Sequence, residues 1–218
     1  MTATGTSEEN TKTRLILAAG EVFARDGFRS ATVREICRRA GTHLGAINYH
    51  FRDKEGLYAA VLDYSHRSAV ATYPPDAGLS GDATPQERLR SFIRAFLLRL
   101  LDEGIPAWHG QLMAREIAAP TGALGQLAQG SIRSQYTVLV DILADLLGEG
   151  RVTPGQESER LFLSAMSIVG QCLHHFTARR VIAALRPQSF DPADIERIAD
   201  HITRFSLGGL RGCTAATR

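Results

Sequence analysis

One segment, residues 32–54, constrains the fold of this chain more than any other. Thr32 and Glu35 have the Ser/Thr-x-x-Glu spacing of a capping box, so a helix is expected to begin directly after Thr32. Gly41 then permits a sharp turn, because glycine lacks the Cβ atom that disfavours left-handed backbone. A second helix is expected over about 42–51. The segment therefore predicts two short helices joined by a tight turn.

The second of these helices has two chemically different faces. Ile47 and Phe51 are four residues apart, so they share the face that points toward the interior. At about 100° per residue, the opposite face carries Thr42, Gly45 and Tyr49, with Ala46 and Asn48 beside them. This outer face is small, able to form hydrogen bonds, and has one aromatic ring.

Basic side chains surround the same segment. The stretch 28–54 holds six of them and two acidic side chains, so its local charge is +4, against +2 for the whole chain. The basic residues are Arg29, Arg34, Arg38, Arg39, Arg52 and Lys54. Such a patch alone fits either a nucleic-acid site or an ordinary solvated helix surface. Combined with two helices and a glycine turn, it predicts a helix-turn-helix, whose second helix reads the major groove of DNA.

The segment and its flanks resemble the DNA-binding domain of the TetR family of transcriptional regulators. The family marks are the FxxxGF element at 23–28 and the FxxKxxL ending at 51–57, and the resemblance covers about the first quarter of the chain. The Asn-Tyr-His-Phe variant at 48–51 resembles the CecR-like branch of the family. Two later stretches, PAWHGQLMARE at 106–116 and VGQCL at 169–173, resemble the C-terminal domain of that branch.

Helical phase and resemblance together give the expected DNA contacts. Phosphates should be bound by Arg34, Thr42, Tyr49 and Lys54. The groove-facing surface should hold His43, Leu44, Gly45, Ala46 and Asn48. Asn48 is expected to pair with adenine and Ala46 to meet a thymine methyl group, while His50 serves as a cap or a phosphate contact. Many family members have tyrosine where this chain has Asn48, so neighbouring Tyr49 is expected to make that phosphate contact.

The rest of the chain reads as helices. Apolar residues at helical spacing predict further helices at about 12–26, 54–71, 84–101, 106–118, 121–147, 153–185 and from 191 onward. Thr84 and Glu87 form a second capping box with Pro85 at the first helical position. Strand-like alternation is absent, so the expected fold is all-α with about nine helices. We expect a disordered tail at 1–10, a three-helix DNA-binding domain at 11–57, and a ligand-binding and dimerisation domain at 58–218.

The last two long helices carry apolar residues on two sides, which suggests burial both within the chain and against a partner. The resemblance implies a homodimer formed through these helices; a monomer with a central helix is the alternative. The expected interface residues are Leu161, Ala165, Ile168, Ile202 and Phe205.

Several classes of function lack support in the sequence. The chain has no G-x-S-x-G, Walker or H-E-x-x-H motif, so neither a catalytic site nor a metal or cofactor site is expected. Cys37, Cys172 and Cys213 are far apart, as in a reducing cytoplasm. The polar N-terminus does not resemble a signal peptide, and no apolar run approaches the roughly 18 residues of a membrane span. A cytoplasmic protein without a membrane partner is therefore expected.

The region 106–116 admits two interpretations. Its mixture of aromatic, titratable and soft apolar groups suits the wall of an effector pocket, or an interdomain hydrogen-bonded core in which Glu116 pairs with Arg115 or a helix end. The pocket is expected between the linking helix at about 55–71 and the helix carrying Cys172. Its expected wall residues are Trp108, His109, Met113, Glu116, Tyr136, Cys172 and Phe176. They favour a largely apolar effector whose polar group is held by His109 or Glu116.

Two functions from different classes follow. The first is a homodimeric, ligand-responsive repressor that binds a palindromic double-stranded operator and is released by a small molecule. The second is an all-α small-molecule-binding protein or enzyme that retains a helix-turn-helix. Dense basic residues beside a small-faced helix favour the first.

Overall fold

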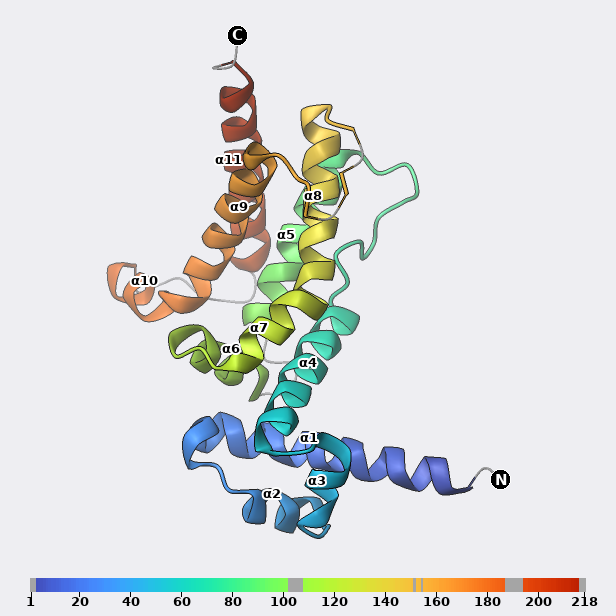
Figure 1. Cartoon of the computed structure of the whole chain (residues 1–218). Helices are drawn as coiled ribbons and strands as arrows, with labels where there is room; N and C mark the ends of the chain where they lie inside the picture. Colours follow the sequence, from blue (N-terminus) through green and yellow to red (C-terminus); the bar gives the residue numbers. More distant parts are fainter. Residues whose placement is uncertain (1–2, 102–107, 151, 154, 187–193, 216–218) are drawn as a thin grey trace. The chain divides into compact units, whose positions relative to one another are not determined.

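The fold is all-α. The computed structural model describes residues 3–101, 108–150, 152–153, 155–186 and 194–215, and every regular element within them is a helix (Figure 1). The chain forms two compact units, one comprising residues 1–68 and 103–132 and the other residues 69–102 and 133–218. The first unit thus combines the helix-turn-helix with residues 103–132, which begin about fifty positions after the end of α3. None of the described helices is long and apolar enough to cross a membrane.

The first unit is built on the helix-turn-helix. Its helices are α1 (Ala3–Ser30), α2 (Val33–Ala40), α3 (Gly45–Phe51), most of α4 (Lys54–Thr72), α6 (Trp108–Ala118), α7 (Gly122–Leu127) and the π-helical segment η1 (Ala128–Ile132). Helix α1 is already helical over 3–10, where the sequence suggested a tail. It kinks at Gly27, whose φ of 78° is non-helical, so its straight part ends where the sequence predicted.

An aromatic cluster lies at the centre of this unit. The ring of Phe23 lies 4.9 Å from that of Tyr58, in an edge-on arrangement, and Phe28 lies 4.9 Å from Tyr58. Leu15 and Ile47 are fully buried in the same core. Phe28, just after the kink, therefore packs against the core of the helix-turn-helix.

The second unit contains α5 (Pro85–Leu101), α8 (Arg133–Leu147), α9 (Glu159–Thr177), α10 (Arg179–Leu185) and α11 (Asp194–Ala215). The predicted capping box of α5 forms completely: Thr84 N–H donates to the Glu87 carboxylate at 2.8 Å, and Glu87 N–H donates to Thr84 Oγ1 at 3.3 Å. Fully buried Ile93, Leu143 and Leu161 belong to one core shared by α5, α8 and α9.

Two helices expected to be continuous are broken. Gly130, with φ −99° and ψ −110°, separates α7 from α8, so the expected helix 121–147 is interrupted. Ala178, with φ −97° and ψ 11°, separates α9 from α10. Helix α9 also begins later than expected, because Ser158 accepts a hydrogen bond from Leu161 N–H at 3.2 Å and caps it. The expected starts at Pro106, Pro154 and 191–192 lie outside the described residues.

Candidate nucleic-acid interface

The turn between α2 and α3 has the geometry that the sequence predicted. Thr32 Oγ1 accepts a hydrogen bond from Glu35 N–H at 3.3 Å and caps α2. Gly41 has φ 62° and ψ 43°, and Thr42 N–H donates to the Cys37 carbonyl at 3.0 Å. This left-handed glycine closes α2 and reverses the chain within a few residues.

Helix α3 begins at Gly45, later than the expected start at residue 42 or 43. The His43 carbonyl accepts a hydrogen bond from Ala46 N–H at 3.1 Å, and the Leu44 carbonyl accepts one from Ile47 N–H at 3.3 Å. His43 and Leu44 therefore form the turn that leads into α3. A Cβ atom at Gly45 would lie 3.1 Å from the His43 ring nitrogen. The exposed start of α3 is therefore compact, which suits close approach to another surface.

The outer face of α3 is exposed, with one exception. Tyr49 is 71% exposed and Leu44 is 55% exposed, and His43, Gly45 and Asn48 are also exposed. Ala46 is only 5% exposed, so its expected place on the groove-facing surface is wrong. Ala46 and half-buried His50 are four residues apart and form one edge of the buried stripe, whose other edge is Ile47 and Phe51.

Two expected phosphate ligands already have partners in the protein. The Tyr49 hydroxyl donates to Glu8 Oε1 of α1 at 3.3 Å. Lys54 Nζ donates to the Arg29 carbonyl at 3.3 Å and lies 4.8 Å from the centre of the Phe28 ring. Lys54 thus joins the end of α1 to the start of α4. To contact a phosphate, its ammonium group would have to bind the phosphate and the Arg29 carbonyl together.

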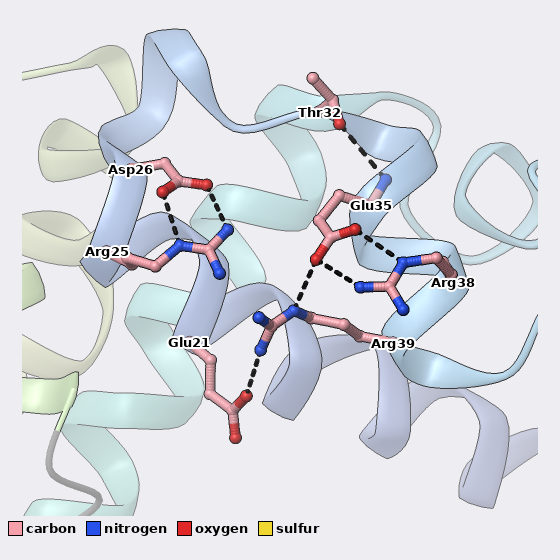
Figure 2. Close-up of polar contacts among 7 residues, drawn as sticks. All are labelled: Glu21, Arg25, Asp26, Thr32, Glu35, Arg38 and Arg39. Carbon is pink, nitrogen blue, oxygen red and sulfur yellow. Dashed lines mark hydrogen bonds and ion pairs between the residues drawn. The ribbon is translucent and has the colours of Figure 1, made fainter.

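Two of the six basic residues around the helix-turn-helix, Arg38 and Arg39, are paired with acids (Figure 2). The Glu35 carboxylate binds Arg38 through two hydrogen bonds of 2.8 Å and Arg39 through a third of 2.8 Å. Arg39 also binds Glu21 at 3.0 Å. These hydrogen bonds from arginine lower the pKa of Glu35 from 4.5 to about 2. The Glu35 carboxylate therefore accepts hydrogen bonds from the two arginines and not from the Thr32 amide. Of the expected capping box, only the hydrogen bond from Glu35 N–H to Thr32 Oγ1 forms.

Three other arginines leave the positive charge available. Arg29, Arg34 and Arg52 are exposed, and none forms an ion pair with a residue that the structure describes. Arg52 follows α3 directly and has φ 74°, the sole positive φ of a non-glycine residue in the described ranges. Positive φ at such a residue is uncommon and points to a constrained position. The sequence had placed Arg52 in the rim without singling it out.

Glu116, one of the expected effector residues of α6, is the centre of a buried hydrogen-bond network within the first unit. Glu116 is 1% exposed and accepts from Tyr58 Oη at 2.8 Å, from Thr121 N–H at 2.7 Å and from Thr121 Oγ1 at 2.8 Å. Thr121 caps α7. Burial, together with the hydrogen bond to Glu116, raises the pKa of Tyr58. Glu116 therefore ties α4, α6 and the start of α7 together. The core interpretation anticipated a helix end as its partner, but these bonds lie within the first unit and not between domains.

Other α6 residues attach this helix to α1 and α4. His109 Nδ1 and Ser65 Oγ form a buried hydrogen bond. A Cβ atom at Gly20 of α1 would lie 2.6 Å from the Trp108 ring, so glycine is what lets the indole pack there. Met113 is buried in the same core. Helix α6 thus contacts α1 of the DNA-binding domain directly.

The remaining expected effector residues belong to the second unit. The Tyr136 hydroxyl donates to Glu157 at 2.9 Å, and burial raises its pKa to about 12. Cys172 is fully buried and Phe176 is 6% exposed. The seven expected wall residues are thus divided, four in the first unit and three in the second. Arg99, a buried residue of α5 that lies near Cys172, was missed.

The expected dimer interface requires correction. Leu161, Ala165, Ile168 and Ile202 are at most 1% exposed and form the core of the second unit, so they cannot be its outer surface. The outward apolar side chains of α9 and α11 are Phe162, Leu163, Met166 and Phe205, exposed by 44, 54, 37 and 65%. Helix α9 therefore has two apolar sides. The side with Leu161, Ala165 and Ile168 is covered by α5 and α8, and the side with Phe162 and Met166 is exposed.

Comparison with known proteins agrees with this geometry. Residues 15–61 match the bacterial regulatory proteins of the tetR family, and residues 85–210 match the C-terminal domain of the HTH-type transcriptional dual regulator CecR. The regulator UidR of Escherichia coli is 34% identical over 68 residues, which are 31% of this chain and 35% of UidR. The CecR protein of Shigella flexneri is 28% identical over 174 residues, 76% of this chain and 75% of that protein.

A TetR-family regulator of known structure, from Mesorhizobium loti, has the same fold. It superposes with a TM-score of 0.66 over 92% of this chain and 96% of its own, at 19% identity. The C-terminal match covers more than half of the present chain, and the N-terminal match contains the whole helix-turn-helix described above. The chain therefore belongs to the TetR family of bacterial transcriptional regulators, in its CecR-like branch.

Proposed function

We propose that the protein is a homodimeric repressor that binds a near-palindromic operator through α3 and releases it when a small molecule binds. The observation that carries the proposal is the exposed face of α3, with Asn48 and Tyr49 at its centre. Arg34 and Arg52, which form no ion pair within the described part of the chain, flank this helix in the sequence. Amide and phenol groups suit base edges and phosphates, and the arginines supply attraction that does not depend on sequence.

The homodimer is proposed from the outer face of the second unit. Helices α9 and α11 contact each other, and Figure 1 shows them side by side. Phe162, Leu163 and Met166 lie within five residues of one another on α9, and Phe205 belongs to α11. Large apolar side chains grouped in this way usually mark a protein interface. A twofold dimer would present two copies of α3 to two half-sites.

Regulation is proposed to act through the block formed by α4 and α6. Helix α4 carries the chain from the first unit into the second, and the Tyr58–Glu116 and Ser65–His109 hydrogen bonds fix α6 to it. An effector that prefers one setting of this block shifts the equilibrium by its difference in affinity for the two settings. A coupling of about 1–3 kcal/mol would lower operator affinity some 5–150-fold.

Salt-dependent binding to a duplex of arbitrary sequence tests the DNA-binding part. The logarithm of the association constant should fall linearly with the logarithm of salt concentration, because bound arginines release counterions. Arg52→Ala should reduce that slope by about one unit. Arg67→Ala is the matched control, because Arg67 is exposed on α4 and lies near Asp63. Equal slopes for all three proteins would contradict the assignment.

A further inference from the structure

Helix α5 carries four arginines inside the second unit, and one of them differs from the rest. Arg88 binds Asp145 at 2.5 Å, Arg90 binds Asp200 at 2.6 Å, and Arg94 binds Glu196. These three are partly exposed. Arg99 is only 5% exposed, yet it forms no ion pair with any described residue. Arg99 is thus the most buried of the four arginines, and it is the one that has no acidic partner among the described residues.

The surroundings of Arg99 satisfy only part of its guanidinium group. Nε donates to the Ala95 carbonyl at 3.2 Å, and Nη1 donates to Gln135 Oε1 of α8 at 2.8 Å. The guanidinium carbon lies 5.7 Å from the centre of the Phe96 ring. Neither Nη2 of Arg99 nor the amide nitrogen of Gln135 has a hydrogen-bond partner among the described residues. Neither nitrogen is among the fully buried atoms without a partner, so the two donors on these adjacent groups are open to a ligand.

The missing charge is not supplied by the neighbouring thiol. Burial raises the pKa of Cys172 to about 12, so this thiol is neutral at physiological pH. Burial lowers the pKa of Arg99 to about 10, so the guanidinium stays charged there. Buried charges in proteins are normally paired, because an isolated ion loses most of its hydration energy. An unpaired one in a ligand-binding family is a candidate anchor for an anion.

We propose that Arg99, with Gln135, binds the carboxylate of an amphipathic effector whose apolar body packs near Phe96 and Cys172. The inference rests on the proposed function, since it names the ligand class of that effector. One guanidinium matches one negative charge, and its planar fork presents parallel donors that suit a carboxylate. This places the polar anchor on α5 and α8 in place of His109 or Glu116.

The first test needs no ligand. Arg99→Met removes a buried charge and keeps an apolar side chain of similar length, so the free protein should melt at the same or a higher temperature. Arg88→Met, on the same helix, is the control and loses a described ion pair. A clear fall in the melting temperature of Arg99→Met alone would show a structural role and overturn the proposal.

The second test uses a matched panel: carboxylates from propionate to dodecanoate, phenylacetate, the corresponding alcohols, and dodecyl phosphate. Carboxylates should raise the melting temperature of wild type and of Arg88→Met, the alcohols should not, and Arg99→Met should bind carboxylates about 10- to 100-fold more weakly. A wild type that responds equally to alcohols, prefers the phosphate, or responds to none of the panel overturns the proposal.

Two acids close to Arg99 in sequence, Asp102 and Glu103, lie outside the described residues. Asp102→Asn and Glu103→Gln should leave the carboxylate response intact; if either mimics Arg99→Met, the partner belongs to this chain and the proposal fails. DNA binding by ligand-free Arg99→Met should equal that of wild type. Loss of DNA binding in wild type would refute the proposed function while leaving the carboxylate result to be judged separately.

Discussion

Replacing Glu116 with alanine should destabilise the first unit strongly. The change removes three accepted hydrogen bonds, and it leaves the Tyr58 hydroxyl buried without an acceptor. A buried donor without a partner costs about 1–3 kcal/mol. Thr121 is half-buried, so water can replace part of what it loses. Loss of this support for the α7 cap adds about 0.5–2 kcal/mol. The total expected loss is about 2–5 kcal/mol.

Two further variants separate the parts of that loss. Tyr58→Phe should cost about 1–2 kcal/mol, because Glu116 keeps both bonds from Thr121. Glu116→Gln should cost less than alanine, because one amide oxygen still accepts from Thr121. The double variant Tyr58→Phe/Glu116→Ala should be less destabilised than the sum of the single changes, since both remove the same bond.

The assay is urea unfolding followed by the fluorescence of Trp108, the sole tryptophan, which belongs to the same unit. The slope of free energy against urea should be unchanged, so that the midpoint reports stability. A Glu116→Ala protein within about 0.5 kcal/mol of wild type would refute the idea that this carboxylate holds the three helices together.

Other predictions concern the charge network, the tight turn and the dimer. Because the pKa of Glu35 is depressed to about 2, its ion pairs stabilise the fold above pH 4.5, and this contribution is lost as the pH falls toward 2; Glu35→Gln should flatten that part of the stability curve. Gly56→Ala should cost about 1–3 kcal/mol by thermal unfolding, since its Cβ atom would lie 2.1 Å from the Phe51 carbonyl oxygen, whereas Gly125→Ala, with open space, should cost nothing. Phe205→Asp should give folded monomers in light scattering with native circular dichroism; a dimeric Phe205→Asp protein would place the interface elsewhere.

Local sequence signals predicted local structure well. The cap at Thr84, the turn at Gly41 and the inward positions of Ile47 and Phe51 depend on neighbouring residues alone, and the structure confirms each. Ala46 was misplaced because a small residue at the edge of a stripe is compatible with either face. Only the packing of α3 on the unit decides which face is buried.

Signals that depend on distant residues were missed or misread. Leu161 and Phe162 are both apolar, and which of them points inward is determined by α5 and α8, not by α9. Arg99 looked like a surface residue, because arginine in an amphipathic helix is normally solvated. The contact between Trp108 and Gly20 joins residues far apart in the sequence, and no local pattern marks it.

The most direct test of the central claim is selection of bound sequences from a randomised duplex library, with wild type and with Asn48→Ala. We predict that wild type enriches a near-palindrome whose half-sites lie about one turn of DNA apart or slightly more. Asn48→Ala should lose preference at a symmetric pair of positions, while its affinity for unselected DNA is unchanged. Gln126→Ala, an exposed amide change on α7, should select the wild-type sequence. A wild-type protein that enriches no sequence, or an Asn48→Ala protein with the same motif as wild type, would contradict it.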